Sequence, residues 1–411
     1  MGYRKFIAIL LLFFWGIKPL ISQQFKAIDS LIEQQIKTSQ ITGGVAYLYH
    51  KNQIVFQKAY GFSDIEKQQP MQLNSIFRIA SNTKIIVSIA TLQLVEKGLL
   101  ALDDPIEKYI PEFSDQKVLK TAGDSFVLVD RNRSVTIRDL LSHQSGIASP
   151  DEFPSRRPLF IQYGLNQSMS SQYPTLAEEV LQIAKMPLLH QPGERFSYGL
   201  STNVLGRLIE KISGLGLDVY LNRNIFRPLG MRDTYFYLPP RKAERLAKVY
   251  VKNPSGQLEA FTSSSANIDY PLIKGSRYFS AIGGLVSTVS DLGKFLICLL
   301  EEGEVAGRRI IGKEMLEQFW SNQLGNKTFI FGGVPSPNNF GLGVGLTTKA
   351  GQKINGASEG TFFWGGAFNT AYMVDRKRRL ITIFFFQRTP FVLPGVLSQL
   401  EKVTIRCIDQ Q

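Results

Sequence analysis

The sequence predicts a mixed α+β or α/β fold, with one antiparallel sheet formed by both chain ends, flanking helices and an inserted all-α region. Segments with strand-like composition lie near both ends, at 43–60 and 361–387. Between them, residues 101–290 show helical patches separated by irregular loops. With 411 residues, 44% of them hydrophobic, the chain can bury a large core. We expect a functional site where the sheet and the helical region meet.

The first 22 residues have the features of a secretory signal peptide. Arg4 and Lys5 form a basic start, and Phe6 to Ile17 is an apolar run too short to span a bilayer comfortably. We therefore expect 1–22 to be a signal peptide, an exported domain over 23–411, and a periplasmic or secreted location without a stable membrane span. An uncleaved membrane anchor is the alternative. Removal of Arg4, Lys5 and Lys18 would take the formal charge from +13 to +10.

The sheet part of the domain is expected at about 23–80 and 338–411, and the helical part at about 81–337. Apolar spacing from Phe25 to Ile36 predicts an amphipathic helix. Lys51 and Asn52 separate two strand-like runs, which predicts a hairpin of Gly43–His50 and Gln53–Tyr60.

Local signals predict further elements along the chain. Thr136 and Asp139 could form a capping box for a short helix through Leu141. The remaining expectations are a helix around Val204–Ile212 ended by Gly214, a helix capped by Ser290, a strand over Thr361–Val374, a strand over Leu380–Gln387 and a C-terminal helix over Gly395–Cys407.

Ser81 and Lys84 form a Ser-x-x-Lys pattern at the start of a predicted helix that runs to Gly98. Residues three apart lie on one helix face, so the hydroxyl and the amine can meet. A serine hydroxyl is a weak nucleophile until a neighbouring group accepts its proton, and a desolvated lysine can do this. The alternative is an ordinary N-cap serine followed by a surface lysine. A second match, Ser114 to Lys117, precedes no helical run and is interpreted as a loop.

Tyr198 lies just before another predicted helix and is a candidate second proton-transfer group. A tyrosine placed between cations can act as a general base. A half-buried aromatic residue at a helix start is the alternative. His143 and His190 are interpreted as loop-forming or structural residues.

Other chemistries find little support. Gly356-Ala-Ser-Glu-Gly360 fits a nucleophile elbow, but a β-rich run follows it and no histidine occurs after His190. No metal-binding motif, cofactor motif or nucleic-acid-binding stretch is recognisable. Cys298 is expected in the core, and pairing with Cys407 stays open.

Several motifs together resemble the serine β-lactamase-like superfamily, and in particular class C β-lactamases and family VIII carboxylesterases. They are Phe77-Arg-Ile-Ala-Ser81-x-x-Lys84, Leu140-Leu-Ser-His-Gln-Ser-Gly146, Pro192-Gly-x-x-Phe-x-Tyr198, Gly283-Gly-Leu-x-Ser-Thr-x-x-Asp291 and Trp364-Gly-Gly366. The resemblance runs from about Phe25 to near the C-terminus. It implies that Ser81 is the nucleophile, Lys84 its base or proton relay, and Tyr198 the second proton-transfer group. It also implies an oxyanion hole formed by the backbone N–H groups of Ser81 and Ala367.

The sequence departs from the family pattern at two positions. Leu200 stands where β-lactamases usually carry the asparagine of Tyr-x-Asn, and Asn203 follows nearby instead. Trp364 stands where penicillin-recognising relatives usually have lysine or histidine. The resemblance thus implies a substrate pocket containing Trp364, Gly365, Gly366 and Asn203, with an apolar surface in place of a cation.

The expected function is that of an exported serine hydrolase that forms a covalent acyl-enzyme on Ser81 and acts on small acyl esters without a cofactor. One alternative is a β-lactamase or D-amino-acid peptidase acting on cell-wall-type peptides. Another is a catalytically weak penicillin-binding-like protein. The sequence leaves the oligomeric state open.

Overall fold

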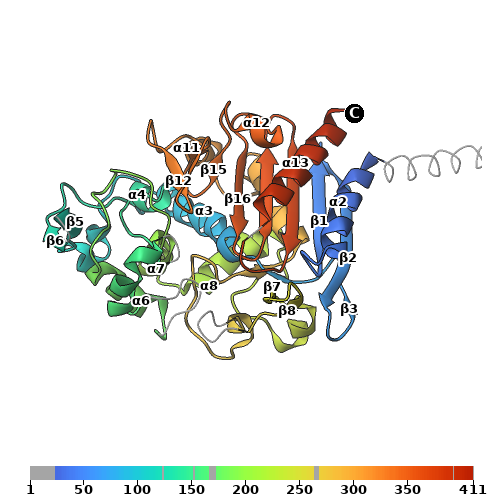
Figure 1. The fold of residues 1–411 in the computed structure, drawn as a ribbon. Helices are drawn as coiled ribbons and strands as arrows, with labels where there is room; N and C mark the ends of the chain where they lie inside the picture. The colour runs from blue at the N-terminus through green and yellow to red at the C-terminus, as the bar shows by residue number, and fades with distance from the viewer. Residues whose placement is uncertain are drawn as a thin grey trace, which may run out of the picture.

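An eight-stranded sheet organises the computed structural model, which describes residues 24–122, 125–150, 153–165, 173–262, 268–391 and 393–410. The strand order is β14-β15-β16-β17-β18-β1-β2-β3 (Figure 1). These strands are Asn339–Phe340, Gly345–Leu346, Phe362–Gly366, Thr370–Asp375, Leu380–Phe386, Gly43–His50, Gln53–Asp64 and Gln69–Pro70. The expected signal peptide, 1–22, lies outside the described residues.

The two chain ends meet in the middle of this sheet, as predicted. Strand β1 pairs antiparallel with β18 on one side, from Gly44 opposite Phe386 to His50 opposite Leu380. On its other side β1 pairs with β2, across the predicted hairpin at Lys51 and Asn52. Both central strands are buried along their whole length because helices cover both faces of the sheet.

One predicted strand proved to be two. The apolar run over Thr361–Val374 contains β16 and β17, which pair antiparallel with Gly366 opposite Thr370. Between them Asn369 adopts a positive φ of 57°, a conformation that asparagine tolerates well. The turn places the end of β16 at the edge of the helical region.

Helices cover each face of the sheet (Figure 1). Helices α2 (Lys26–Lys37) and α13 (Pro394–Asp409) pack on one face and share a core with the side chains of that face. Helices α3 (Thr83–Glu96) and α10 (Val289–Leu300) belong to the larger core on the opposite face. Cys298 is fully buried in that core, as expected, and both Cys298 and Cys407 are free.

The inserted region is largely, but not wholly, helical. Its helices are α4 (Ile137–Leu141), α5 (Arg157–Gln162), α6 (Leu176–Lys185), α7 (Ser201–Ser213), α8 (Leu217–Leu221), α9 (Arg227–Leu229) and α11 (Lys313–Phe319). Its two-stranded ribbons are β5–β6 (Val118–Ala122, Ser125–Val129), β7–β8 (Tyr250–Lys252, Leu258–Ala260), β10–β11 (Glu304–Val305, Arg308–Arg309) and β12–β13 (Phe329–Phe331, Val334–Ser336). These ribbons correct the expectation of an all-α region.

Two predicted helix ends are confirmed and one is corrected. Thr136 and Asp139 form the capping box of α4, and Gly214 ends α7 with a φ of 69°. Helix α10 is capped by Thr288, whose Oγ1 accepts from Asp291 N at 3.1 Å, and not by Ser290. Thr288 has the extended backbone that an N-cap needs, whereas Ser290 already lies inside the helix.

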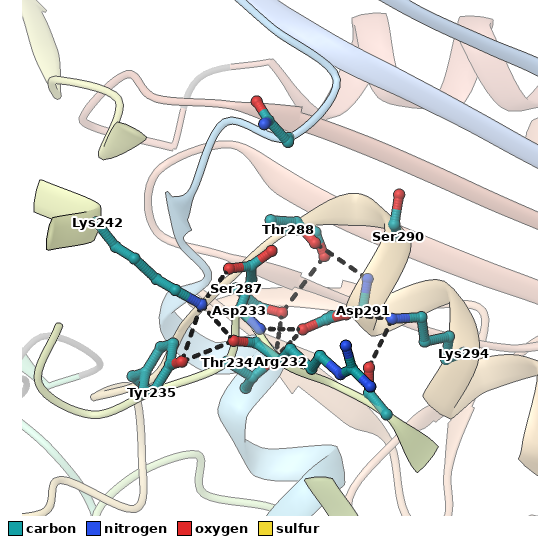
Figure 2. Close-up of polar contacts among 12 residues, drawn as sticks. Arg232, Asp233, Thr234, Tyr235, Lys242, Ser287, Thr288, Ser290, Asp291 and Lys294 are labelled. Atoms are coloured by element: carbon teal, nitrogen blue, oxygen red, sulfur yellow. Dashed lines mark hydrogen bonds and ion pairs between the residues drawn. The ribbon is translucent and has the colours of Figure 1, made fainter. Parts of the chain in front are cut away.

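Asp291 also ties α10 to the loop that follows α9 (Figure 2). One carboxylate oxygen accepts from the backbone N–H of Asp233 at 2.6 Å, and the other pairs with Lys294 at 2.7 Å. Asp233 in turn pairs with Lys242 at 2.6 Å. The motif that ends at Asp291 therefore has a structural role. Thr234 contacts both Asp291 and Ser287 of strand β9 (Val286–Ser287), and β9 pairs with the strand that precedes the turn carrying Ser81.

Among the helices that the structure describes, none combines the length and the apolar character that crossing a membrane requires.

Candidate active site

Ser81 lies in a tight turn between a short strand and the buried helix α3. Strand β4 (Phe77–Arg78) pairs with β9, a 3-10 turn covers Ala80–Asn82, and α3 begins at Thr83. Every residue of α3 from Thr83 to Leu94 is buried, so the helix is held from all sides. The prediction that Ser81 stands at the start of a helix is confirmed.

The turn is anchored to the sheet by Thr370 of β17. Thr370 Oγ1 donates to the carbonyl of Ile79 at 3.2 Å and accepts from Asn82 Nδ2 at 3.1 Å. Ala80, between these contacts, has a positive φ of 45°, which a residue with a Cβ rarely adopts. Strained backbone of this kind persists only where its surroundings hold it, and it concentrates at functional sites.

The Lys84 amine lies beside the Ser81 hydroxyl. Lys84 Nζ is 3.2 Å from Ser81 Oγ and donates to the carbonyl oxygen of Ile282 at 2.7 Å. It also lies 4.6 Å from the centre of the Tyr198 ring. Ser81, Lys84 and Tyr198 therefore come together, as the sequence predicted.

Tyr198 stands within a group of rings. The ring centroids of His143, Phe331 and Trp364 lie 4.7, 5.2 and 5.5 Å from that of Tyr198. Trp364 Nε1 donates to the Tyr198 hydroxyl at 3.4 Å. Because these side chains fix the ring on several sides, the phenol oxygen has a defined position near the Ser81–Lys84 pair.

His143 packs against Tyr198 as a neutral side chain. It is buried and has the positive φ of 54° expected of a loop-forming residue. Burial first, and then the charge of Lys84, hold the pKa of His143 well below its usual range. A histidine that stays neutral adds no positive charge beside Lys84. His190 is structural, with its Nε2 2.9 Å from Ser197 Oγ.

A cavity of about 620 Å³ opens over Ser81. Six predicted residues besides Ser81 line it: Lys84, Tyr198, Trp364, Gly365, Gly366 and Ala367. Sequence reasoning missed the apolar part of its wall, which includes Phe329, Phe331, Val334, Phe363 and Phe391. Among the described residues that line the cavity, Lys84 is the only basic one.

Asn203 does not line the cavity, which corrects the expectation that it belongs to the substrate pocket. Its side chain is fully buried. Asn203 Nδ2 donates to Glu179 at 2.6 Å, and Oδ1 accepts from the backbone N–H of Ile282 at 3.1 Å. Since the carbonyl of Ile282 accepts from Lys84, Asn203 holds the peptide segment that positions the amine.

Glu179, which sequence reasoning missed, completes this buried network. It accepts from Asn203 and, at 2.9 Å, from the Tyr278 hydroxyl. Burial raises the pKa of Glu179 to about 7, and the two hydrogen bonds oppose that shift. A glutamate on an amphipathic helix normally indicates a solvated face, so the sequence offered no signal for it.

The family profile described as Beta-lactamase matches residues 28–397 of the chain. The chain belongs to the beta-lactamase family. It is a serine hydrolase related to β-lactamases and esterases.

Alignments with similar proteins cover most of the length of this chain. Protein Rv1367c of Mycobacterium tuberculosis (strain ATCC 25618 / H37Rv) is 30% identical over 361 residues, which are 85% of this chain and 86% of the relative. Lovastatin esterase of Penicillium rubens is 28% identical over 86% of this chain and 90% of the relative. The structure of EstCE1, a hydrolase with promiscuous acyltransferase activity, superposes with a TM-score of 0.81 at 21% identity, covering 93% of this chain and 99% of EstCE1. At that identity the superposition shows the shared fold alone.

The alternative serines lie apart from this beta-lactamase-family site. Ser358 is buried, its Oγ accepts from Arg378 at 2.7 Å, and β16 rather than a helix follows it. Ser114 ends a 3-10 turn and donates to Pro111, as a loop residue would. Within the described ranges, no group of three or more His, Cys, Asp or Glu residues is placed to hold a metal ion.

Proposed function

We propose that the protein is an exported serine esterase that acts on small, largely apolar acyl esters through an acyl-enzyme on Ser81. Ser81 Oγ attacks the ester carbonyl, and its proton passes through Lys84 and Tyr198 to the departing alcohol. Water then attacks the acyl-enzyme, gives up a proton along the same path and releases the carboxylic acid. The backbone N–H groups of Ser81 and Ala367 are proposed to bind the oxyanion.

The observation that carries this proposal is the 3.2 Å approach of Lys84 Nζ to Ser81 Oγ at the floor of an apolar cavity. A lysine amine that contacts a hydroxyl in a dry site is placed to accept its proton. Lovastatin esterase, one of the similar proteins, is named for hydrolysis of an ester.

The apolar lining of the cavity favours neutral esters over β-lactams, which carry a carboxylate. Trp364 offers an apolar ring and one N–H where a cation would pair with the carboxylate of a β-lactam. Arg388 does not replace that cation, because its side chain is buried and donates to the backbone of Gln40 at 3.0 Å. A neutral ester leaves no charge unpaired in the cavity.

We expect p-nitrophenyl butyrate to have a higher kcat/KM than a chromogenic cephalosporin, by roughly one to two orders of magnitude. Trp364→Lys should narrow that ratio because it supplies a cation for the carboxylate. The measurement compares both substrates on wild type and on Trp364→Lys. A wild-type preference for the cephalosporin would replace the esterase assignment with that of a β-lactamase.

A fluorophosphonate should label the peptide that contains Ser81, as peptide mapping by mass spectrometry would detect. Ser81→Ala should abolish labelling and esterase activity. Ser114→Ala, a matched control in the other Ser-x-x-Lys pattern, should retain both. Labelling of another serine in wild type would refute the assignment of Ser81.

A further inference from the structure

The cavity over Ser81 also extends to the helices beside strand β16, which form a second end. Helix α12 (Gln352–Asn355) contributes Ile354 and Asn355 to its wall, and α13 contributes Leu397, Ser398 and Glu401. Figure 1 shows α12 and α13 beside β16. Phe363 and Trp364 are consecutive residues of β16 and face opposite sides of the sheet, and both line the cavity, which therefore reaches both sides of this strand.

One carboxyl group stands at this far end. Pro394, Leu397, Ser398 and Glu401 recur at intervals of three or four residues, so they occupy one face of α13. That face borders the cavity, and Glu401 is the only acidic residue among the described residues that line it. Glu401 is thus the one charged side chain among these four residues.

Among the described residues, Glu401 pairs with a neutral side chain and with no cation. Asn355 Nδ2 donates to Glu401 Oε2 at 2.7 Å. The Asn355 amide is fixed in that orientation because its Oδ1 accepts from Ala357 N at 3.0 Å. In the part of the chain that the structure describes, Glu401 forms no ion pair, and the bond from Asn355 is the one hydrogen bond of its carboxyl group.

This arrangement is poorly explained by stability alone. Glu401 is half-buried, and a carboxylate partly shielded from water without a cation costs some free energy, which the hydrogen bond from Asn355 offsets only in part. Burial raises the pKa of Glu401 to about 7 against the lowering effect of Asn355. Phe363 and Phe391 add aromatic rings to the lining of the same cavity, and such rings attract cations.

We propose that the far end of the cavity is a subsite for a cationic ammonium group at the end of the substrate, recognised by Glu401. The apolar wall between Ser81 and Glu401 would hold the connecting chain, and Asn355 would orient the carboxylate. The proposal rests on the proposed esterase function, since it names a substrate class for that cavity.

The kinetic test uses paired p-nitrophenyl esters whose acyl chains end in a trimethylammonium group or in the neutral, isosteric tert-butyl group. A series of chain lengths is needed so that one member spans the cavity. At the best length, Glu401→Gln should lower kcat/KM for the cationic ester about fivefold and leave the neutral ester within twofold. Glu359→Gln, an exposed control on the segment before β16, should change neither.

A binding measurement tests the proposed Glu401 subsite without requiring ester hydrolysis. Isothermal titration calorimetry should show an alkyltrimethylammonium ion binding to Ser81→Ala, with binding weakened about fivefold when Glu401→Gln is added. If neutral esters are hydrolysed but neither assay depends on Glu401, the subsite is refuted and the esterase function stands. If no ester is hydrolysed while cation binding still depends on Glu401, the esterase function fails and the subsite stands.

Discussion

Lys84 and Tyr198 are the residues on which the proposed proton path depends. We expect Lys84→Ala and Tyr198→Phe each to lower the acylation rate roughly a hundred- to ten-thousand-fold, the usual contribution of a general acid or base. Stopped-flow measurement of the p-nitrophenol burst tests this, with circular dichroism to verify the fold. Lys97→Ala, at the exposed end of α3, and Tyr235→Phe serve as matched controls. Near wild-type rates for Tyr198→Phe would make Tyr198 a structural aromatic residue only.

Glu179 should make the protein less stable as pH rises. Its pKa is raised from 4.5 to about 7 in the folded protein, so the folded state holds the proton more tightly than the unfolded state. The free energy of unfolding is therefore highest below about pH 4.5. It falls by up to about 3 kcal/mol as pH rises through about 7. The pKa of Glu401 is also raised to about 7, so its carboxyl lowers the stability over the same pH range.

Denaturant unfolding at several pH values tests whether the free energy of unfolding falls as pH rises. Glu179→Gln keeps an oxygen that can accept from Asn203 and Tyr278, so it should flatten the decline between pH 5 and 7, a window bounded by the two pKa values. Glu112→Gln, on the surface, should leave the decline unchanged. Equal slopes for wild type and Glu179→Gln would show that the carboxyl is not the titrating group.

The close approach of strand β16 to the turn that carries Ser81 requires glycine at 366. A methyl group there would collide with the carbonyl oxygen of Ile79 and with Thr370 Oγ1. We expect Gly366→Ala to displace the strand end from Ser81 and lower kcat at least tenfold, because small misplacements of reacting groups are costly. Gly395→Ala, in open space in α13, should keep full activity. Retained kcat in Gly366→Ala would indicate that the strand end does not position the reaction.

Local patterns predicted some elements well and others poorly. The Ser81–Lys84 pair was predictable because helix geometry alone joins residues three apart. The break between β16 and β17 was missed because apolar residues continue through the turn at Asn369. Asn203 was misassigned because its partners, Glu179 and Ile282, come from distant segments. Glu401 was missed for the same reason, since only tertiary packing brings α13 to the cavity.

The proposed export of the whole molecule leads to a prediction about its mature N-terminus. The described contacts of the N-terminal region begin with Gln24, whose Nε2 donates to Cys407 O at 2.8 Å, and Phe25 is fully buried. Cleavage near Ser22 would leave these contacts intact. Expression in an export-competent bacterium should yield a periplasmic or secreted protein whose intact mass lacks about 22 residues. A chain begun at Gln23 should stay inside the cell, and recovery of unprocessed protein in the membrane fraction would indicate an uncleaved anchor.

The position of β18 between β17 and β1 also sets the order of events during biosynthesis. The first strands made by the ribosome have no partner on one side until residues 380–386 have been synthesised. Pairing between segments so far apart in sequence forms slowly, because a long loop must close first. The nascent chain therefore stays open until its C-terminal segment emerges. An unfolded chain is what a narrow translocation channel can accept, so this order of events suits the proposed export.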